Sequence, residues 1–232
     1  MIKIILGNIG SGKTLTAVMK MKQMGEIIFT NIDVKGDNII RLRYDMIIKD
    51  VIVGERKDGS QITKKAVNWE FWREALGKYG NFHIVIDEIA NVFSSRRSMH
   101  SGSVCFQQWV AQIRKITGSS EKCHFIVITQ EISRVDVALR ELAQEIIYCE
   151  KMQTHTLVLT KCLEQGKLIN KQIPVTYIFN YYFSGEMVIQ RYWDYRETNQ
   201  RTYNRKTWFI GNLYFSVYDS YQILDFGESA YL

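Results

Sequence analysis

Residues 7–14 have the types and the spacing of a phosphate-binding loop. Their sequence, GNIGSGKT, matches G-x-x-x-x-G-K-T and lies between an apolar run and a segment of helix-forming residues. Glycines let backbone N–H groups close around phosphates, and the positive end of the following helix faces the same anion. We expect Lys13 to reach the β- and γ-phosphates of a nucleotide and the Thr14 hydroxyl to bind Mg²⁺. The alternative, a glycine-rich turn that matches by accident, does not explain the strand and helix around it. The expected nucleotide contacts are Gly7, Asn8, Ile9, Gly10, Ser11, Gly12, Lys13, Thr14 and Leu15.

Two adjacent acids supply a second chemical element. Asp87 and Glu88 lie near the end of an apolar run, residues 82–90, that is typical of a buried parallel strand. Ligands gather at the carboxyl ends of such strands. We predict that Asp87 holds Mg²⁺ through water and that Glu88 orients and deprotonates the attacking water. The alternative is that the two acids cap the next helix. The adjacent Glu88 favours hydrolysis over the phosphoryl transfer of a small-molecule kinase, which would also need an arginine-rich lid that we do not find.

A glutamine and several arginines are candidates for the rest of the site. Gln130 ends a second apolar run, residues 123–130, where a polar side chain can sense the γ-phosphate and link hydrolysis to movement. Oligomeric motors add an arginine from the neighbouring subunit, because charge on the γ-phosphoryl group needs stabilisation in the transition state. Arg114 is our first choice for this role, and a surface salt bridge is its alternative role. The other candidates are Arg96, Arg97, Arg134 and Arg140.

Size and composition indicate a globular protein. The chain has 232 residues, of which 46% are hydrophobic, and this is enough for a sizeable core in a single domain. The first apolar run is the strand of the phosphate loop, so no signal peptide is indicated. The longest uncharged stretches, 172–185 and 207–218, fall short of the ~18–20 apolar residues that span a bilayer. We expect a cytoplasmic protein without an integral membrane segment, located in the host cytoplasm if it is viral.

Net charge and the spacing of cysteine and histidine residues bear on polyanion binding, zinc binding and disulfides. The net charge of +6 is compatible with a polyanionic partner, although solvated surface explains most basic excess. The four cysteines form no C-x-x-C pair and the four histidines show no ligand spacing, so neither a zinc site nor a disulfide framework is indicated. Buried thiols are the expected state of the cysteines.

Alternating strands and helices should position the chemical residues over residues 1–150. Helical periodicity or capping residues predict helices at 14–24, after Asn68, at 101–117 and after a capping box at 133–136. Gly25 and Gly80 are the expected ends of the first two helices. Strands are expected at residues 26–31, 82–90 and 123–130. This alternation predicts an α/β fold with a mainly parallel sheet.

Two further regions are predicted to form β-hairpins. Residues 51–65 alternate around Asp58-Gly59, a two-residue turn signal, and carry basic side chains. They form either a solvated loop or a grip on DNA or on a neighbouring subunit. From residue 146 onward the chain is rich in tyrosine and β-prone, so we expect residues 151–232 to be a β-rich extension of the same domain. The segments expected as strands include IIYCEK, THTLVLTK, VTYIFNYYF, EMVIQRYWDY and LYFSVYDSY.

Together these motifs resemble a known family, the Zot-type ATPases of the FtsK/HerA superfamily. This group includes the assembly ATPases of filamentous phages and is related to viral genome-packaging ATPases and conjugative coupling ATPases. The resemblance covers about residues 1–150 well and the remainder loosely. It rests on GNIGSGKT, FTNID, VIDEIANVFSSR, a helix ending in QIRKITG, VITQEISRVDVALREL and a late YFSVYDSY.

The resemblance implies a RecA-like (ASCE) P-loop NTPase fold, Mg²⁺-ATP as cofactor, ring oligomers and DNA as the polymer that is moved. It also implies Gln130 as the sensor and Arg114 as the arginine that acts in a neighbouring subunit. Because the sequence lacks the membrane-spanning segment of the phage assembly proteins, we favour packaging over extrusion.

We therefore expect an ATP-driven translocase of double-stranded DNA. It would act as a homo-oligomeric ring, expected to be a hexamer, and package a viral genome with a capsid or membrane-associated viral protein as a further partner. One alternative is a Zot-like assembly or secretion ATPase that acts on protein at a membrane. Another is a small-molecule kinase.

Overall fold

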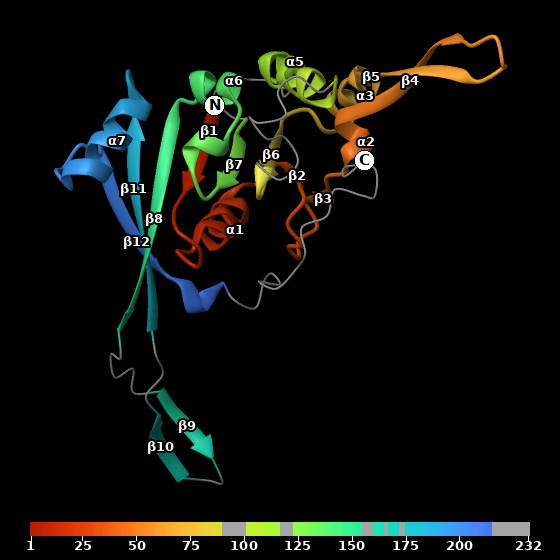
Figure 1. The fold of residues 1–232 in the computed structure, drawn as a ribbon. Helices are drawn as coiled ribbons and strands as arrows, with labels where there is room; N and C mark the ends of the chain where they lie inside the picture. The colour runs from red at the N-terminus through yellow and green to blue at the C-terminus, as the bar shows by residue number, and fades with distance from the viewer. Residues whose placement is uncertain (90–100, 117–122, 155–159, 165–166, 172–174, 215–232) are drawn as a thin grey trace.

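The computed structural model describes residues 1–89, 101–116, 123–154, 160–164, 167–171 and 175–214. Its centre is an eight-stranded sheet in the order β12-β11-β8-β1-β7-β6-β2-β3 (Figure 1). The six strands from β8 to β3 are parallel, and β11 and β12 extend the sheet in antiparallel pairing. The strands are β1 (Ile2–Leu6), β2 (Ile27–Thr30), β3 (Ile39–Arg41), β6 (Phe82–Ile86), β7 (Phe125–Thr129), β8 (Glu145–Thr154), β11 (Val175–Ser184) and β12 (Arg205–Ile210). This confirms the predicted mainly parallel α/β fold.

Helices cover both faces of the sheet because the central strands are apolar on both sides. Ile4 and Leu6 of β1 face one core, whereas Ile5 faces the other. Helix α1 (Lys13–Gln23) packs in the second core through side chains such as Val18. The first core is formed with α3 (Trp69–Tyr79), α5 (Ser101–Ile116), α6 (Val137–Leu142) and α7 (Val188–Thr198).

Aromatic rings fill the core beneath α3 and α5. Trp72 and Trp109 are fully buried, with ring centroids 5.4 Å apart. Trp72 also stacks on Phe82 of β6 at 5.6 Å, so α3 is anchored against the strand that precedes the two acids. The Asn68 side chain accepts a hydrogen bond from Phe71 N and caps α3, as predicted. The face of α3 that carries Trp72 is therefore part of the core.

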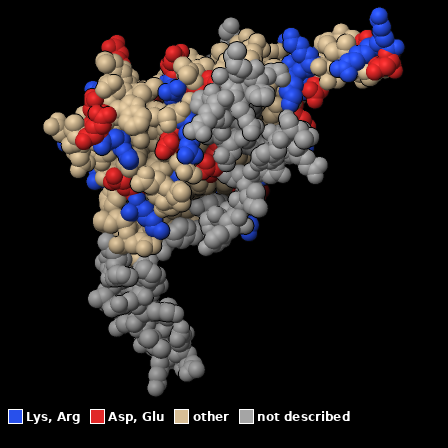
Figure 2. Space-filling view, viewed as in Figure 1, with Lys and Arg blue, Asp and Glu red and all other residues tan. Residues whose placement is uncertain are grey.

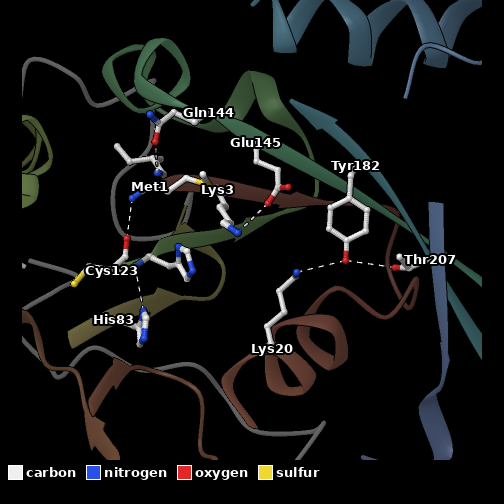
Figure 3. Close-up of polar contacts among 11 residues, drawn as sticks. Met1, Lys3, Lys20, His83, Cys123, Gln144, Glu145, Tyr182 and Thr207 are labelled. Carbon is white, nitrogen blue, oxygen red and sulfur yellow. Dashed lines mark hydrogen bonds and ion pairs between the residues drawn. The ribbon is translucent and has the colours of Figure 1, made fainter. Parts of the chain in front are cut away.

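Polar contacts join α1 and β1 to the later strands (Figure 3). Lys3 Nζ lies 3.0 Å from a carboxylate oxygen of Glu145, which ties β1 to β8. Lys20 Nζ donates to the Tyr182 hydroxyl at 3.4 Å, and the Thr207 hydroxyl donates to the same oxygen at 3.4 Å. The contacts connect the residues before 150 to β11 and β12, although the single-domain boundaries stay a prediction.

Two hairpins extend away from the sheet (Figure 1). Strands β4 (Ile48–Glu55) and β5 (Gln61–Val67) form the first, which follows the short helix α2 (Tyr44–Ile47). Lys and Arg side chains gather on it, together with a few acids (Figure 2). Strands β9 (Thr160–Glu164) and β10 (Lys167–Lys171) form the second.

The structure corrects one large prediction. The segment EMVIQRYWDY, expected as a strand, contains most of α7. Its buried residues are Val188, Tyr192 and Tyr195, at positions i, i+4 and i+7, and they pack on β8 and β11 as one helical stripe. Packing of this stripe overrides the strand propensity of its tyrosine, valine and isoleucine residues. The segment LYFSVYDSY lies mostly outside the described residues.

Three smaller predictions about element ends are wrong. The capping box at 133–136 does not open a helix at Ser133: residues 132–134 form a 3₁₀ turn, and Asp136 caps α6 by accepting from Ala138 N at 2.9 Å. Helix α1 ends at Gln23, and its C-cap is Met24, which has extended backbone, so Gly25 is not its cap. The β4–β5 turn is wider than two residues, because Arg56 N donates to Ser60 O around it.

Among the described helices, none has the length and apolarity needed to cross a bilayer.

Candidate active site

The loop between β1 and α1 has little room for side chains at two of its glycines. A Cβ at Gly7 would lie 2.3 Å from Ser11 Oγ and 2.6 Å from Cys149 O. Gly12 has φ of +91°, and a Cβ there would lie 2.5 Å from the Ile178 side chain. Only glycine fits these positions, so the chain turns tightly and directs α1 away from the loop. The buried Ser11 Oγ has no hydrogen-bond partner among the described residues, and it could donate to a phosphate oxygen.

Lys13, the first residue of α1, is a buried cation. Its side chain lies across the loop, where Nζ donates to Asn8 O at 2.9 Å, and the residue is 7% exposed. Burial lowers the pKa of Lys13, whereas the nearby Glu88 and Asp87 raise it. A lysine in this position can neutralise phosphate charge in a site that water reaches poorly.

A hydrogen bond between Thr14 and Asp87 joins the start of α1 to the end of β6. Thr14 Oγ1 donates to Asp87 Oδ2 at 2.6 Å, although β7 lies between β1 and β6 in the sheet. Asp87 is only 3% exposed, and burial raises its pKa to about 6, while the hydrogen bond from Thr14 opposes this rise. A hydroxyl and a carboxylate are hard oxygen ligands of the kind that Mg²⁺ prefers, so the donor set fits this ion.

Glu88 and Gln130 also meet, as their places at neighbouring strand ends suggest. Gln130 Nε2 lies 3.4 Å from Glu88 Oε1, a long hydrogen bond between the ends of β7 and β6. Glu88 has a left-handed backbone, with φ of +49°. A residue other than glycine adopts this conformation at a cost, which surrounding contacts must offset.

The structure adds one residue that the sequence interpretation gave no role. Asn31 follows β2, and its side-chain amide bonds to the backbone of Asp87 in both directions. The signal for it was the placement of a polar residue directly after a strand that ends at the same edge of the sheet as the acids.

The arginine candidates are only partly described. Arg114 lies in α5, but its side chain is outside the described residues, as are Arg96 and Arg97. Arg134 pairs with Glu131 at 3.2 Å on the surface. The fourth alternative, Arg140, is in the last turn of α6. The identity of an arginine that acts in a neighbouring subunit stays a prediction.

A cavity of about 770 Å³ flanks the loop on the side away from the acids. Strands β8 and β11 form its wall, on the opposite side of β1 from β7 and β6. Lys206 Nζ lies 4.7 Å from the ring centroids of both Phe179 and Tyr181 at this wall. The lining residues are Asn8, Ile9, Gly10, Ser11, Tyr148, Cys149, Glu150, Lys151, Met152, Phe179, Tyr181 and Lys206.

The part of the chain that contains the phosphate-binding loop and the paired acids matches one protein family. The family model described as zonular occludens toxin (Zot) matches residues 1–183. The chain belongs to the Zot family. The Gene 1 protein of Enterobacteria phage I2-2 is 26% identical to this Zot-family chain over 157 residues. That match covers 64% of the chain but only 40% of the phage protein, so the chain spans less than half the length of this curated relative.

Two solved structures are similar to the Zot-family chain at lower identity. The N-terminal domain of zonular occludens toxin from Neisseria meningitidis has 15% identity and a TM-score of 0.48, covering 94% of this chain and 98% of that one. The genome packaging NTPase B204 from Sulfolobus turreted icosahedral virus 2, in complex with ATP-gammaS, has 13% identity and a TM-score of 0.38. This second match covers 63% of the Zot-family chain and 74% of B204.

Proposed function

We propose that this chain hydrolyses ATP with Mg²⁺ and uses the cycle to move double-stranded DNA during virus assembly. The observation that carries the ATPase assignment is the contact between Thr14 Oγ1 and Asp87 Oδ2 at 2.6 Å, directly after the loop of residues 7–14. Two oxygen ligands for a metal are thereby placed beside a phosphate-binding loop and a buried lysine.

Each residue of the site has a separate task in this proposal. The loop amides and Lys13 bind the phosphates, while Thr14 and Asp87 hold the metal. Bound Mg²⁺ would neutralise charge on the phosphates. Glu88 accepts a proton from the attacking water, and Gln130, which contacts it, responds to the γ-phosphate. Since Glu88 directly follows Asp87, one strand end supplies both the metal ligand and the base.

DNA as the moved polymer is supported by charge. The net charge is +6, and the β4–β5 hairpin carries exposed basic side chains at Arg56, Lys57 and Lys64 (Figure 2). Phosphate contacts by such residues give affinity that does not depend on base sequence. A ring of identical subunits, with hexamer as the expected size, would let each copy hold the same strand in turn, and Arg114 is our choice for the shared arginine.

Membership in the Zot family favours a second candidate, an assembly or secretion ATPase that acts on protein at a membrane. In this case the exposed hairpin would contact a protein partner. The two candidates share the nucleotide site and differ in what stimulates it.

The test is steady-state ATP hydrolysis by purified protein with and without double-stranded DNA, at low and at moderate salt. The Glu88→Gln variant measures contaminating ATPase activity. Under the DNA proposal, hydrolysis rises with DNA and the stimulation weakens as salt rises, because counterions compete for the phosphates. Hydrolysis that DNA leaves unchanged at every salt concentration would favour the second candidate. No difference between wild type and Glu88→Gln would contradict the ATPase assignment itself.

A further inference from the structure

Asn31 grips a single residue of the candidate site from both sides of its backbone. Asn31 Nδ2 donates to Asp87 O at 3.0 Å, and Asn31 Oδ1 accepts from Asp87 N at 2.8 Å. Asn31 is fully buried, so water does not compete for either hydrogen bond. Buried hydrogen bonds of this kind are costly to leave half-made, because the remaining donor or acceptor stays desolvated.

The two hydrogen bonds hold two different peptide planes. Asp87 N belongs to the peptide that enters the residue from β6, and Asp87 O belongs to the peptide that leads to Glu88. Fixing both planes fixes the two soft backbone dihedrals of Asp87 between them. The direction of the Asp87 side chain is thereby set, and so is the orientation of the next peptide group.

The Asp87 carboxylate then acts in two directions. Oδ2 accepts from Thr14 Oγ1 at 2.6 Å, and Oδ1 accepts from Glu88 N at 2.8 Å. The second contact holds the N–H of the residue whose φ is +49°. A left-handed backbone at a non-glycine residue costs on the order of 1–3 kcal/mol and persists where neighbouring contacts determine it. Here those contacts begin at Asn31.

The local sequence explains why Asn31 turns inward. Thr30, the last residue of β2, is fully buried, and its hydroxyl accepts from Ile32 N at 3.1 Å. This hydrogen bond closes a tight turn around Asn31 at the end of the strand. β2 pairs directly with β6, so the turn places the amide beside Asp87.

We propose that Asn31 is the positioning residue of the candidate active site: its amide sets the backbone of Asp87 so that one carboxylate serves the metal and Glu88 is held in its left-handed position. The inference rests on the proposed ATPase function. Asparagine suits the task because it has a donor and an acceptor on one short side chain. Aspartate keeps the acceptor and loses the donor, whereas leucine, of similar size, has neither.

The first measurement needs neither nucleotide nor metal. Hydrogen exchange at the Asp87 amide, followed by mass spectrometry of the peptide that contains it, reports directly on the contact with Asn31 Oδ1. We expect slow exchange in wild type, faster exchange in Asn31→Leu, and near wild-type exchange in Asn31→Asp. Equal exchange in wild type and Asn31→Leu would overturn the inference.

The second measurement separates positioning from general damage. If Asn31 positions Asp87, Asn31→Asp should lower kcat about 10- to 100-fold and weaken the apparent Mg²⁺ affinity. The reason is that one buried hydrogen bond is no longer made and the Asp87 carboxylate is misplaced. ATP binding without Mg²⁺ should change less than about twofold, since the loop is untouched. The matched control is Asn38→Asp, because the Asn38 amide also bonds backbone carbonyls, those of Met24 and Glu26, outside the site.

The outcomes distinguish this inference from the proposed function. If wild type hydrolyses ATP and Asn31→Asp keeps the wild-type kcat and Mg²⁺ requirement, the positioning role is wrong. It is equally wrong if Mg²⁺-free binding falls as far as Mg²⁺-dependent turnover, because that pattern reports a disturbed loop. If wild type does not hydrolyse ATP at all, the proposed function fails. The hydrogen-exchange result still decides whether the Asn31 amide holds the backbone of Asp87.

Discussion

The two halves of the sheet are built from different side chains. In the parallel half, most residues of β1, β6 and β7 are aliphatic, and Asp87 and Gln130 directly follow the ends of β6 and β7. In the antiparallel half, the helix α7 meets β11 and the adjoining strand β8 through tyrosine rings, among them Tyr195 of α7, Tyr181 of β11 and Tyr148 of β8. In the first half the polar residues of the candidate site gather at one edge of the sheet, whereas in the second half hydroxyl groups are distributed through the core. A substitution at a buried position is therefore expected to have different effects in the two halves.

Hydroxyl groups in the antiparallel half find cationic and polar partners. Arg196 donates to the Tyr148 hydroxyl, and its guanidinium lies 4.7 Å from the centroid of the same ring. Tyr182 receives hydrogen bonds from Lys20 and Thr207. Tyrosine can thus fill a core while its hydroxyl group keeps a hydrogen-bond partner. We expect the first half to determine activity and the second to determine how the stability of the fold responds to alkaline pH.

The largest expected effect is in the parallel half. Glu88→Gln should lower ATP turnover by at least about 10³-fold, because the amide cannot accept the proton of the attacking water. ATP binding should persist, since Lys13 and the loop are unchanged. Turnover is measured by phosphate release and binding by a fluorescent ATP analogue. Full hydrolysis by this variant would remove Glu88 from the role of base.

The next effect compares one tryptophan from each half. Trp72→Ala should lower the free energy of unfolding by about 3–5 kcal/mol, because it leaves a large cavity among rings that pack on β6. Trp208→Ala on β12 should change it by less than about 1 kcal/mol, because that side chain is 59% exposed. Urea denaturation of both variants gives the two values. Similar losses would show that Trp208 is buried in solution, for example by a second copy.

The smallest expected effect is alkaline destabilisation of the antiparallel half. Burial raises the pKa of Tyr181 to about 12 and also raises the pKa values of Tyr148 and Tyr195. Unfolded tyrosines lose their protons near pH 10, so between about pH 10 and 12 the unfolded chain binds fewer protons than the folded one. The stability present below pH 10 should therefore fall as pH rises through this window. Denaturation at pH 9, 10 and 11 measures the slope, which Tyr181→Phe should reduce; an unchanged slope would place the titrating groups elsewhere.

The parallel half was predictable from the sequence because its signals are local. The glycine spacing of the loop, the cap at Asn68 and the apolar runs before Asp87 and Gln130 each describe one element, and parallel strands bring their ends together at one edge. That rule places Glu88 and Gln130 at the same edge of the sheet, and the structure adds the contact between them. Asn31 was missed because its partner is the backbone of Asp87, a contact that residue types alone do not show; its position directly after a strand was the signal.

The antiparallel half was harder because its residue types favour strands in isolation. The helix α7 contains valine, isoleucine, tyrosine and tryptophan, and its helical period of buried positions was the signal that outweighed propensity. Likewise, Ser133 and Asp136 both fit the start of a helix, and the 3₁₀ turn at 132–134 decided between them. Such choices depend on how neighbouring elements pack.

Strand β8 extends well beyond the strand with which it pairs in the parallel sheet. β8 pairs with β1 only as far as Tyr148, but β11 follows it to Thr154. The last six residues of β8 therefore extend about 20 Å beyond the last pair with β1, at about 3.3 Å per residue, with β11 beside them and β12 paired to β11 as far as Tyr177. The extension leaves the parallel sheet next to the phosphate loop, where Gly7 has no space for a Cβ beside Cys149 O. A rotation of about 10° at that point would move the far end of β8 by about 3.5 Å, so a small change at the loop would become a displacement of atomic size about 20 Å away.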